Sequence, residues 1–371
     1  MVDLRPQYNE EAVGANHPTK ADVLNRHWDV EHEIDGTHKA GVGSVTFLSV
    51  SEALAGSEPA KSLAADTLKA ARAVDASFWG IKNLRLIQAK GGDHTIVQVN
   101  PDAMNIALNV GAHYHIMTAA VDVDVADDLD TGAVAAGTDY YVYACTDGTN
   151  LTFKVSAAST YPSTHDAAHS RKIGGFHTLC VAVGAIAGHS LASYAVKDIL
   201  PASIWDLKHR TKNLVNAGMV YSDKLMIWVD IYLASGTSAA SVYNATTADT
   251  RNLMDFIDNG RDGNKRLSSD PEFQIYAFGT PESLSVAGAA DPVTTGGHNN
   301  SAGSRIISNI GCEDCCGCWW QWLDPYIGAN GLIAGGSWNL GASSGSRYRD
   351  ADTARTLAVT PIGARFVAEP L

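Results

Sequence analysis

Short alternating runs of apolar and polar residues fill residues 80–190, and turn residues such as Gly91-Gly92 and Asp147-Gly148 separate them. Alternation with a period of two places every second side chain on one face, which is typical of half-buried β-strands. The predicted strands are Leu84–Ala89, Thr95–Val99, Ile106–Val110, Tyr114–Val125, Tyr140–Cys145, Leu151–Val155 and Phe176–Val183. We therefore expect an antiparallel sandwich or barrel in this part of the chain.

Helical periodicity is confined to short segments. A stretch rich in Ala, Leu, Lys and Glu predicts one helix from Pro59 onward, and a connecting helix is predicted over Ile204–Asn216. A third helix is predicted over Thr247–Asp258, because apolar residues recur there at helical spacing. The residues that share its apolar face are Leu253, Phe256 and Ile257.

A fourth helix is predicted to begin at Ser269. The sequence S-D-P-E places Pro271 in the first turn and Glu272 at the position that completes a capping box. Beyond Gly279 the chain is rich in Gly, Ser and Asn, and we expect only short strands there.

Changes in texture along the chain predict three regions. Residues 1–45 have too few apolar side chains for a core, and residues 1–80 are interpreted as an extended arm with a short helix. Residues 81–200 form the β-sandwich or barrel-like domain, and residues 201–371, where Trp is frequent, form a separate domain. The chain has 371 residues, of which 45% are hydrophobic and only 18% charged, with 34 Gly, which indicates a rigid, loop-rich β protein and excludes a disordered one.

The net charge is acidic, with 40 Asp and Glu against 27 Lys and Arg and no basic block. Binding of nucleic acid through its phosphates needs clustered Lys and Arg, so the sequence predicts no nucleic-acid partner. No run of about 18 apolar residues is present, and we expect no membrane insertion. The first residues lack an apolar signal core, which favours synthesis in a cytoplasm.

Four of the six cysteines crowd into one segment, Cys312-Glu-Asp-Cys-Cys-Gly-Cys318. Structural zinc sites usually take two ligands from one turn and two from a distant one, and four ligands within seven residues do not easily form a tetrahedron. Adjacent cysteines are also poorly placed to bond to each other. The favoured interpretation is a set of buried small thiols, with a metal site as the alternative.

Two other segments have side chains that metals bind. His113 and His115 lie on one face of a predicted strand, so three chains meeting on an axis would bring six imidazoles together. Half-exposed polar positions are the favoured interpretation, and the two histidines stay weak metal candidates. The acidic residues of 122–130 lack the Gly and Glu of a calcium loop and are read as a solvated strand edge; they are Asp122, Asp124, Asp127, Asp128 and Asp130.

No motif for catalysis is evident. The sequence contains no GxSxG, HExxH or P-loop motif and no GxGxxG after a strand. We therefore expect a protein without catalytic residues and without a cofactor.

Four motifs follow one another in the C-terminal part of the chain: R-L-S-S-D-P-E-F from Arg266, E-D-C-C-G-C-W-W-Q-W from Glu313, A-G-G-S-W-N from Ala334 and P-I-G-A-R-F-V from Pro361. Together they resemble formylglycine-generating-enzyme-like (sulfatase-modifying-factor) domains. That family has an α+β C-type lectin fold, which the resemblance implies for the C-terminal part of this chain. The strand pattern of the preceding residues predicts a mainly β N-terminal fibre region. Gln321 stands where the family usually has Glu.

The residues of these motifs also have a direct physical interpretation as scaffold. Trp320 and Trp322 alternate with Gln321 on a strand, so both rings face one side. Two adjacent glycines before a Trp permit a close backbone approach, and an Arg between apolar residues is a candidate for a buried, multiply bonded guanidinium. The predicted scaffold residues are Gly317, Trp320, Trp322, Gly335, Gly336, Trp338 and Arg365.

One departure argues against the oxidase activity of that family. The enzymes need redox cysteines late in the domain, and residues 319–371 contain none. The ending, from A-G-G-S-W through G-S-R-Y-R to I-G-A-R-F-V, is more similar to variable proteins of diversity-generating retroelements, of the phage major-tropism-determinant type. Such proteins keep a lectin-like scaffold and vary exposed residues near the C-terminus.

The second resemblance implies a ligand-binding surface on the residues between the scaffold motifs. Aromatic, acidic and aliphatic side chains are interleaved there without helical or strand period, a mixture that resembles antibody contact surfaces. The expected ligand-binding positions are Asn339, Leu340, Ser343, Ser344, Tyr348, Asp350, Asp352, Thr353, Leu357, Val359 and Pro361.

The resemblance implies a non-catalytic receptor-binding protein at the tip of a phage or prophage tail. Its expected partners are a host-surface protein or glycan and, through the N-terminal region, other virion tail proteins, and we expect a homotrimer. The alternatives are a formylglycine-generating-type oxidase, disfavoured by the missing late cysteines, and a structural tail-fibre or baseplate subunit. The Glu-Pro-Asn signature of calcium-dependent sugar binding is absent, which disfavours glycan binding by that route.

Overall fold

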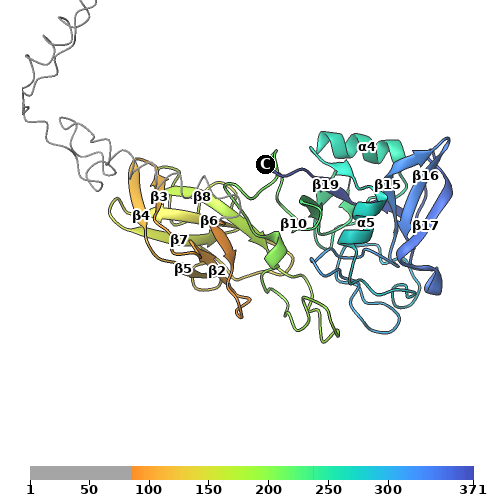
Figure 1. Ribbon diagram of the computed structural model, residues 1–371, viewed down its shortest axis with the longest axis horizontal. Helices are drawn as coiled ribbons and strands as arrows, with labels where there is room; N and C mark the ends of the chain where they lie inside the picture. Colours follow the sequence, from red (N-terminus) through yellow and green to blue (C-terminus); the bar gives the residue numbers. More distant parts are fainter. Residues whose placement is uncertain (1–84, 237) are drawn as a thin grey trace, which may run out of the picture. The chain divides into compact units, whose positions relative to one another are not determined.

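The structure, a computed structural model, describes residues 85–371 with the exception of residue 237. The predicted arm of residues 1–80, with its helix beginning at Pro59, lies outside the described residues. Among the described residues, no helix is long and apolar enough to cross a membrane. Figure 1 shows the course of the chain.

The first part of the described chain contains three sheets. One sheet has the strand order β1-β2-β5, a hairpin joins β3 to β4, and a third sheet has the order β7-β6-β8-β9. All neighbouring strands in them are antiparallel, as the alternation predicts. The strands are β1 (Ile87–Ala89), β2 (Ile96–Val99), β3 (Ile106–Val110), β4 (His113–Met117), β5 (Val121–Asp124), β6 (Asp139–Thr146), β7 (Leu151–Ser156), β8 (Ser170–His177) and β9 (Trp205–Asp206).

A shared apolar core joins these sheets. In β3, Ile106, Leu108 and Val110 are buried while the residues between them are half-buried, which is the period-two pattern read from the sequence. Their core also contains Ile173 and Phe176 of β8. The apolar alternation therefore places strands of all three sheets around one interior.

Two predicted strands differ from the observed ones. The predicted strand Tyr114–Val125 is two strands, because residues 118–120 leave β4 and the chain then pairs with β2 as β5. The predicted strand Phe176–Val183 is displaced, since β8 begins at Ser170 and ends at His177. The first residues of β8 are polar, so a search for apolar alternation does not detect them as a strand. The apolar residues that follow β8, such as Val183, are buried in a second core.

The predicted helix Ile204–Asn216 is wrong. This segment contains the short strand β9, preceded by a 3-10 turn, η1 (Pro201–Ser203), and continues without helix. The Asp206 carboxylate accepts hydrogen bonds from the backbone N–H groups of Lys208 and His209, both at 2.8 Å. A side chain that bonds the backbone two and three residues ahead stabilises a turn in competition with a helix.

The rest of the described chain forms the C-terminal region, with two four-stranded sheets and two α-helices. The sheet orders are β10-β11-β19-β14 and β17-β16-β15-β18, and β12 and β13 form a separate pair. Only the β15–β18 pairing is parallel. The elements are β10 (Met219–Ser222), β11 (Ile227–Asp230), β12 (Ala234–Ser235), β13 (Ala240–Ser241), α4 (Leu253–Asp262), β14 (Arg266–Leu267), α5 (Asp270–Tyr276), β15 (Trp320–Ile327), β16 (Asn330–Gly335), η2 (Gly341–Ser343), β17 (Gly345–Ala354), β18 (Ile362–Ala364) and β19 (Phe366–Ala368).

The α4 helix begins later than predicted. Thr247 is buried and forms a bridge with Ser235, so it does not cap the helix. The cap is Asn252, whose side chain accepts from the backbone N–H groups of the first turn, while Asp255 bonds back to the N–H of Asn252. The predicted start at Thr247 is therefore wrong, although the apolar face is correct in that Leu253 is buried.

The α5 helix confirms the capping prediction. Ser269 is its N-cap, the Glu272 carboxylate accepts the Ser269 backbone N–H at 2.7 Å, and a proline occupies the first turn. Beyond Gly279 the expectation of only short strands is wrong, because β15 and β17 are long. Register shifts in their pairing with β16 interrupt the alternation by which a sequence pattern would reveal them.

Candidate ligand-binding surface

The central strand β15 places its side chains in two buried environments. Trp320 and Trp322 point to one side and pack in the apolar cluster beside α4. Gln321, on the other side, donates its amide protons to the carbonyl oxygens of Asp314 at 3.1 Å and Cys315 at 3.0 Å. The predicted common face of the two tryptophans is confirmed, and the Gln321 side chain ties β15 to the turn before it.

Arg365 is the polar centre of this interior and is 1% exposed. Its guanidinium donates to the carbonyl oxygens of Asp230 at 2.6 Å, Ile231 at 2.5 Å and Glu313, and to the Gln321 side chain at 3.3 Å. Burial alone would lower the pKa of Arg365, but the negative charges of the ionised Cys315, Cys312 and Tyr276 side chains, with that of Asp314, outweigh burial and raise it. The prediction of a buried, multiply bonded guanidinium is confirmed.

Gly335, the last residue of β16, and Gly336, which follows it, adopt a conformation that favours glycine. Their φ angles are 92° and 76°. A Cβ at Gly335 would lie 2.7 Å from the carbonyl oxygen of Cys315, and one at Gly336 would lie 2.7 Å from the Cα of Ser344. The predicted close backbone approach is therefore present on both sides of this glycine pair.

The adjoining turn is fixed by backbone bonds. The N–H of Gly317 donates to the carbonyl of Gly335 at 3.0 Å, and the N–H of Trp338 donates to Cys318 at 2.9 Å. The Trp338 ring is half-buried and meets the Trp319 ring edge-on, with 5.9 Å between centroids. We use the name frame for the predicted scaffold residues, which are Gly317, Trp320, Trp322, Gly335, Gly336, Trp338 and Arg365.

Residues 339–361, here the display segment, follow directly on this frame. They comprise η2, the edge strand β17 and the loop that leads to β18. The absence of strand period in the sequence is misleading, because β17 is a strand whose pairing with β16 shifts register. An edge strand with an irregular register leaves many side chains facing solvent.

Most of the predicted ligand-binding positions have exposed area. The exposed ones are Asn339, Tyr348, Asp352, Leu357 and Val359. The partly exposed ones are Leu340, Ser343, Asp350, Thr353 and Pro361. The display segment thus combines aromatic, acidic and aliphatic side chains on one continuous stretch.

Ser344 is the exception and is 3% exposed. Its carbonyl accepts the N–H of Ser283 at 2.8 Å, and its hydroxyl donates to the carbonyl of Gly341 at 2.6 Å. The expectation of an exposed side chain at Ser344 is therefore wrong, although Ser344 lines the groove between α5 and β17.

Tyr348 connects the display segment to the frame. Its side chain is 41% exposed, and its ring centroid lies 5.7 Å from that of Trp320. An aromatic ring supported on one face by a buried tryptophan has little conformational freedom to lose on binding. Tyr348 is thus an exposed aromatic side chain of the display segment whose ring lies against the frame.

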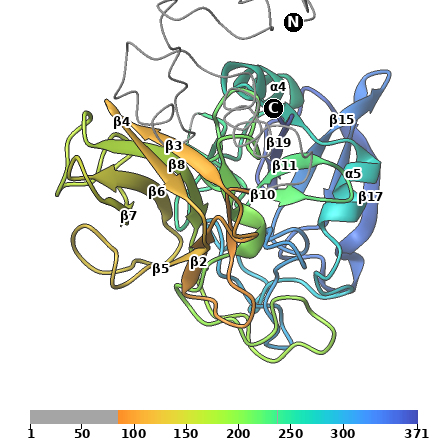
Figure 2. The ribbon, with the colours of Figure 1, turned by 60° about the vertical axis from the view of Figure 1, so that its left-hand side comes forward.

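Arg349, which sequence reasoning did not single out, anchors β17 to α5. Its guanidinium pairs with Asp270 and lies 4.8 Å from the centroid of the Phe273 ring. It also donates to the carbonyl of Ser346 at 2.7 Å. Figure 2 shows α5 beside β17, as these contacts require. The Glu282 carboxylate adds a second anchor, because it accepts the N–H of Ser346 at 3.1 Å.

An open groove of about 680 Å³ lies between the end of α5 and the start of β17. Phe278 is 61% exposed on one wall, and Tyr348 stands on the other. The remaining lining residues are Gln274, Gly279, Thr280, Glu282, Ser283, Ala342, Ser344, Ser346 and Arg347. No motif marks residues 274–283 as part of this surface, because only the fold brings them to the display segment.

His113 and His115 have the same-face arrangement predicted for them. Both are half-buried on β4, and the Nε2 atom of His115 lies 2.9 Å from the Thr146 hydroxyl. Burial, together with the nearby His113, lowers the pKa of His115. This agrees with the favoured interpretation of half-exposed polar strand positions.

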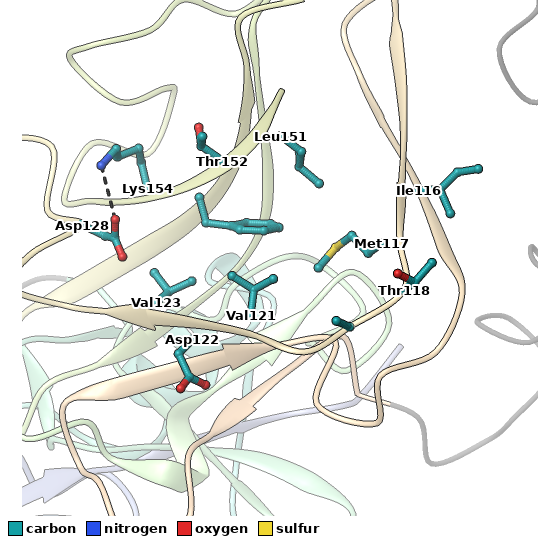
Figure 3. Close-up of a pocket in the computed structure, with 12 residues that line it drawn as sticks. Ile116, Met117, Thr118, Val121, Asp122, Val123, Asp128, Leu151, Thr152 and Lys154 are labelled. Atoms are coloured by element: carbon teal, nitrogen blue, oxygen red, sulfur yellow. Dashed lines mark hydrogen bonds and ion pairs between the residues drawn. The ribbon is translucent and has the colours of Figure 1, made fainter. Parts of the chain in front are cut away.

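The acidic stretch has no calcium-loop arrangement in the described residues. Asp122 pairs with Lys90, Asp128 lies 3.3 Å from Lys154, and Asp124 accepts backbone N–H groups of the turn after β5. Asp122 and Asp128 line a hollow of about 530 Å³, shown in Figure 3. Since β5 is an edge strand, the interpretation as a solvated strand edge agrees with the structure.

The clustered cysteines are all buried and free, as are Cys145 and Cys180. Burial raises the pKa of Cys316 and Cys318 well above the usual value. The favoured interpretation of the cluster as buried thiols is confirmed in that respect. Cys312 and Cys315 pack in the second core, beneath the sheet that contains β11.

A buried frame of strands that presents exposed side chains of mixed chemistry is typical of a binding protein. Comparison with known proteins identifies its family. Residues 92–206 match the family model described as Mtd second domain. The chain is 31% identical over 285 residues to the "Tail fiber receptor-binding protein" of Bordetella phage BPP-1, covering 64% of this chain and 73% of that one.

Solved structures of the same kind agree with this match. The Major Tropism Determinant M1 and P3c variants each give a TM-score of 0.66 at 26% identity, covering 78% of this chain and 85% of theirs. The U1 variant gives a TM-score of 0.65 at 25% identity, with the same coverage. The chain therefore belongs to the family of major-tropism-determinant-type phage tail receptor-binding proteins, and its C-terminal region has a C-type lectin-like fold.

Proposed function

We propose that this protein binds a molecule on the host-cell surface through the display segment and the groove beside it. The observation that carries the proposal is the contrast between a buried, hydrogen-bonded frame and the exposed side chains that follow it directly. Family membership supports it, since the curated relative is named as a receptor-binding protein of a tail fiber. Binding without catalysis is the function, in keeping with a family of receptor-binding proteins.

Within this surface, the contact residues are those of the display segment that have exposed area, Ser344 excluded. They are Asn339, Leu340, Ser343, Tyr348, Asp350, Asp352, Thr353, Leu357, Val359 and Pro361. Phe278 joins them from the opposite wall of the groove. Aromatic residues at the centre of such a surface usually supply most of the binding energy, so Tyr348 and Phe278 are the principal anchors.

We further propose that the frame is of the formylglycine-generating-enzyme-like type and that a retroelement diversifies the display segment. The buried Arg365 and the glycine pair of β16 support the first part, because they hold backbone and leave the display side chains free. Sequencing the neighbouring DNA tests the second. A near-copy of the 3′ end that differs at adenines, beside a reverse-transcriptase gene, is the expected result, and a locus without either contradicts it.

The remaining parts of the proposal concern assembly. We propose that residues 1–80 attach the chain to other virion proteins, that residues 81–200 and 201–371 act as two domains, and that the chain is a homotrimer at the tail tip. Three weak sites that engage one surface together give a much higher avidity than one site. The receptor is a host-surface protein or a glycan bound without the calcium-dependent sugar signature.

The test is adsorption of the full-length protein to host cells. Tyr348→Ala should lower cell binding by at least about tenfold, as expected when a central aromatic anchor is removed. Tyr161→Ala is the matched control, because Tyr161 is 43% exposed but lies outside the surface. Equal binding by the wild type and the Tyr348 variant would contradict the proposed surface.

A further inference from the structure

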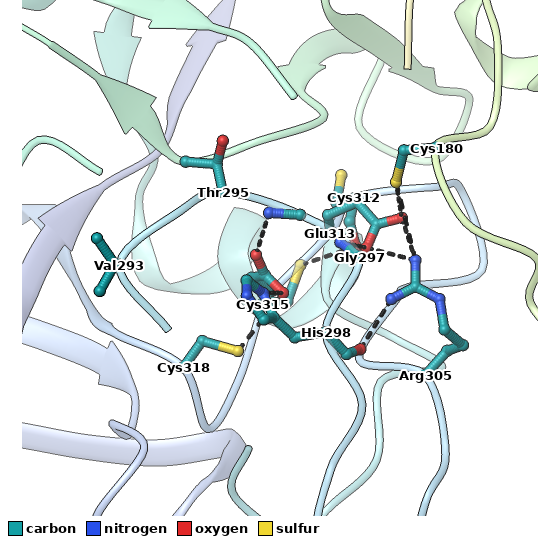
Figure 4. A network of polar contacts seen from close by, with 12 residues as sticks. Cys180, Val293, Thr295, Gly297, His298, Arg305, Cys312, Glu313, Cys315 and Cys318 are labelled. Carbon is teal, nitrogen blue, oxygen red and sulfur yellow. Dashed lines mark hydrogen bonds and ion pairs between the residues drawn. The ribbon is translucent and has the colours of Figure 1, made fainter. Parts of the chain in front are cut away.

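Three side chains with different donor atoms lie close together, and they are those of His298, Asp314 and Cys318. Figure 4 labels His298 and Cys318. The Nδ1 atom of His298 lies 2.9 Å from Oδ1 of Asp314, and the Cys318 Sγ lies 3.4 Å from the same oxygen. All three donor atoms lie within 4.8 Å of one another. Asp314 and Cys318 come from one turn, and His298 comes from the loop before it.

This set of donors suits zinc. An imidazole nitrogen, a carboxylate oxygen and a thiolate sulfur are all regular ligands of Zn²⁺, at about 2.0–2.3 Å from the metal. Calcium and magnesium take oxygen ligands and would not select this set. The spacing also avoids the difficulty of the four clustered cysteines, because only Cys318 takes part and the third ligand comes from another segment.

The site is preorganised by the backbone. Asp314 is fully buried and adopts a φ of 57°, a conformation uncommon for residues other than glycine. Its second oxygen accepts the N–H of Gly296 at 2.6 Å, which fixes the orientation of the carboxylate. The adjacent Glu313 pairs with Arg305 at 2.6 Å and is therefore already neutralised. The Asp314 carboxylate remains for the histidine and the thiol.

Charge balance favours a divalent cation at this buried position. Zn²⁺ with one carboxylate, one thiolate and one neutral imidazole has no net charge, which reduces the cost of burial. Binding expels the Cys318 thiol proton and any proton on Nδ1 of His298, and both go to solvent.

We propose that His298, Asp314 and Cys318 bind one Zn²⁺ ion, with a solvent molecule as the fourth ligand. Solvent reaches the site from the side where His298 lies. The His298 side chain is 17% exposed, whereas the Asp314 side chain is 0% exposed. The ion has a structural role, because the carbonyl of Cys318 accepts the N–H of Trp338 directly before the display segment. Zn²⁺ therefore stabilises the turn around Cys318, to which the residue directly before the display segment is hydrogen-bonded.

Cobalt provides the direct test. The full-length protein, stripped of metal by a chelator, is titrated with Co²⁺ and its absorption spectrum recorded. One Co²⁺ per chain should give a sulfur-to-cobalt charge-transfer band and intense tetrahedral d–d bands, and Zn²⁺ should displace both. Cys318→Ala should abolish the charge-transfer band, and Cys316→Ala, the matched buried cysteine two residues away, should retain it.

A second variant and a second measurement distinguish the loss of a metal ligand from the loss of the fold. His298→Gln alters the most accessible ligand and should weaken Zn²⁺ binding by at least about tenfold. Excess Zn²⁺ should raise the Tm of the wild type and of Cys316→Ala, and should leave that of His298→Gln and Cys318→Ala unchanged. Absence of a charge-transfer band in the folded wild type, or its persistence in Cys318→Ala, would overturn the proposal. The spectra and Tm values are measured without host cells, so the metal proposal and the host-binding proposal can fail separately.

Discussion

The frame and the display segment are neighbours in sequence but differ in how their side chains are held. In the frame, Trp322 is fully buried and Arg365, 1% exposed, bonds several backbone carbonyls. In the display segment, Tyr348 is 41% and Leu357 39% exposed. Substitutions at exposed positions usually change stability by less than about 0.5 kcal/mol, whereas core truncations cost several times more. A protein built in this way can alter its contact chemistry without endangering its fold.

The largest effect on stability is expected from Trp322→Ala. Removing a fully buried indole should lower the free energy of unfolding by about 4 kcal/mol, through lost burial and the cavity that remains. Denaturant titration measures it, and Trp322→Phe, which keeps much of the volume, should cost clearly less. A loss as small as that of a surface substitution would place Trp322 outside the frame.

Arg365→Met should have the second-largest effect and lower the free energy of unfolding by about 3 kcal/mol. The methionine keeps part of the apolar volume but leaves the carbonyls of Asp230 and Ile231 without their donor. The control is Arg347→Met, since Arg347 is an exposed arginine within strand β17. Equal unfolding free energies for the two variants would show that the buried guanidinium does not support the frame.

Lowering the pH should decrease the free energy of unfolding through the half-buried His209. His209 packs against Tyr221 and Trp228, and burial, with Arg85 nearby, lowers its pKa to about 3. A histidine with a lowered folded pKa binds fewer protons folded than unfolded, so its stability contribution is lost as pH falls below about 6.5. The wild type should lose about 1 kcal/mol more than His209→Phe between pH 7 and pH 5, after allowance for solvent screening. Parallel pH profiles of unfolding free energy would contradict this.

The smallest effects on stability are expected in the display segment. Asp352→Asn and Leu357→Ala should each change the free energy of unfolding by less than about 0.5 kcal/mol, because both side chains are exposed. Thermal unfolding of each variant beside the wild type measures the change. A loss of more than about 1 kcal/mol would mean that these residues belong to the frame.

Predictions from the sequence were confirmed where a feature depends on neighbouring residues or on the strong preference of one side chain. The β3 alternation, the Ser269 capping box and the buried Arg365 all depend on residues near in sequence or on a strong local preference. Predictions from the sequence failed at Ile204–Asn216, where the Asp206 side chain stabilises a turn, and at the long strand β17, whose register shifts remove the period.

The candidate site was only partly accessible from the sequence. The display segment was found through family motifs that bracket it, and most of its predicted positions do have exposed area. Ser344 is buried where the chain lies against Gly336, and Phe278 joins from a distant segment. Both depend on tertiary contacts between segments far apart in the chain, which no local pattern records.

The central claim is that stability resides in the frame and recognition in the display segment. The most direct test is one protein with Tyr348→Ala, Asp352→Ala and Leu357→Ala together, measured for both thermal unfolding and adsorption to host cells. We predict a Tm close to that of the wild type and a loss of cell binding of at least about a hundredfold, as anchors are removed together. Binding at the wild-type level by the folded variant would contradict the account.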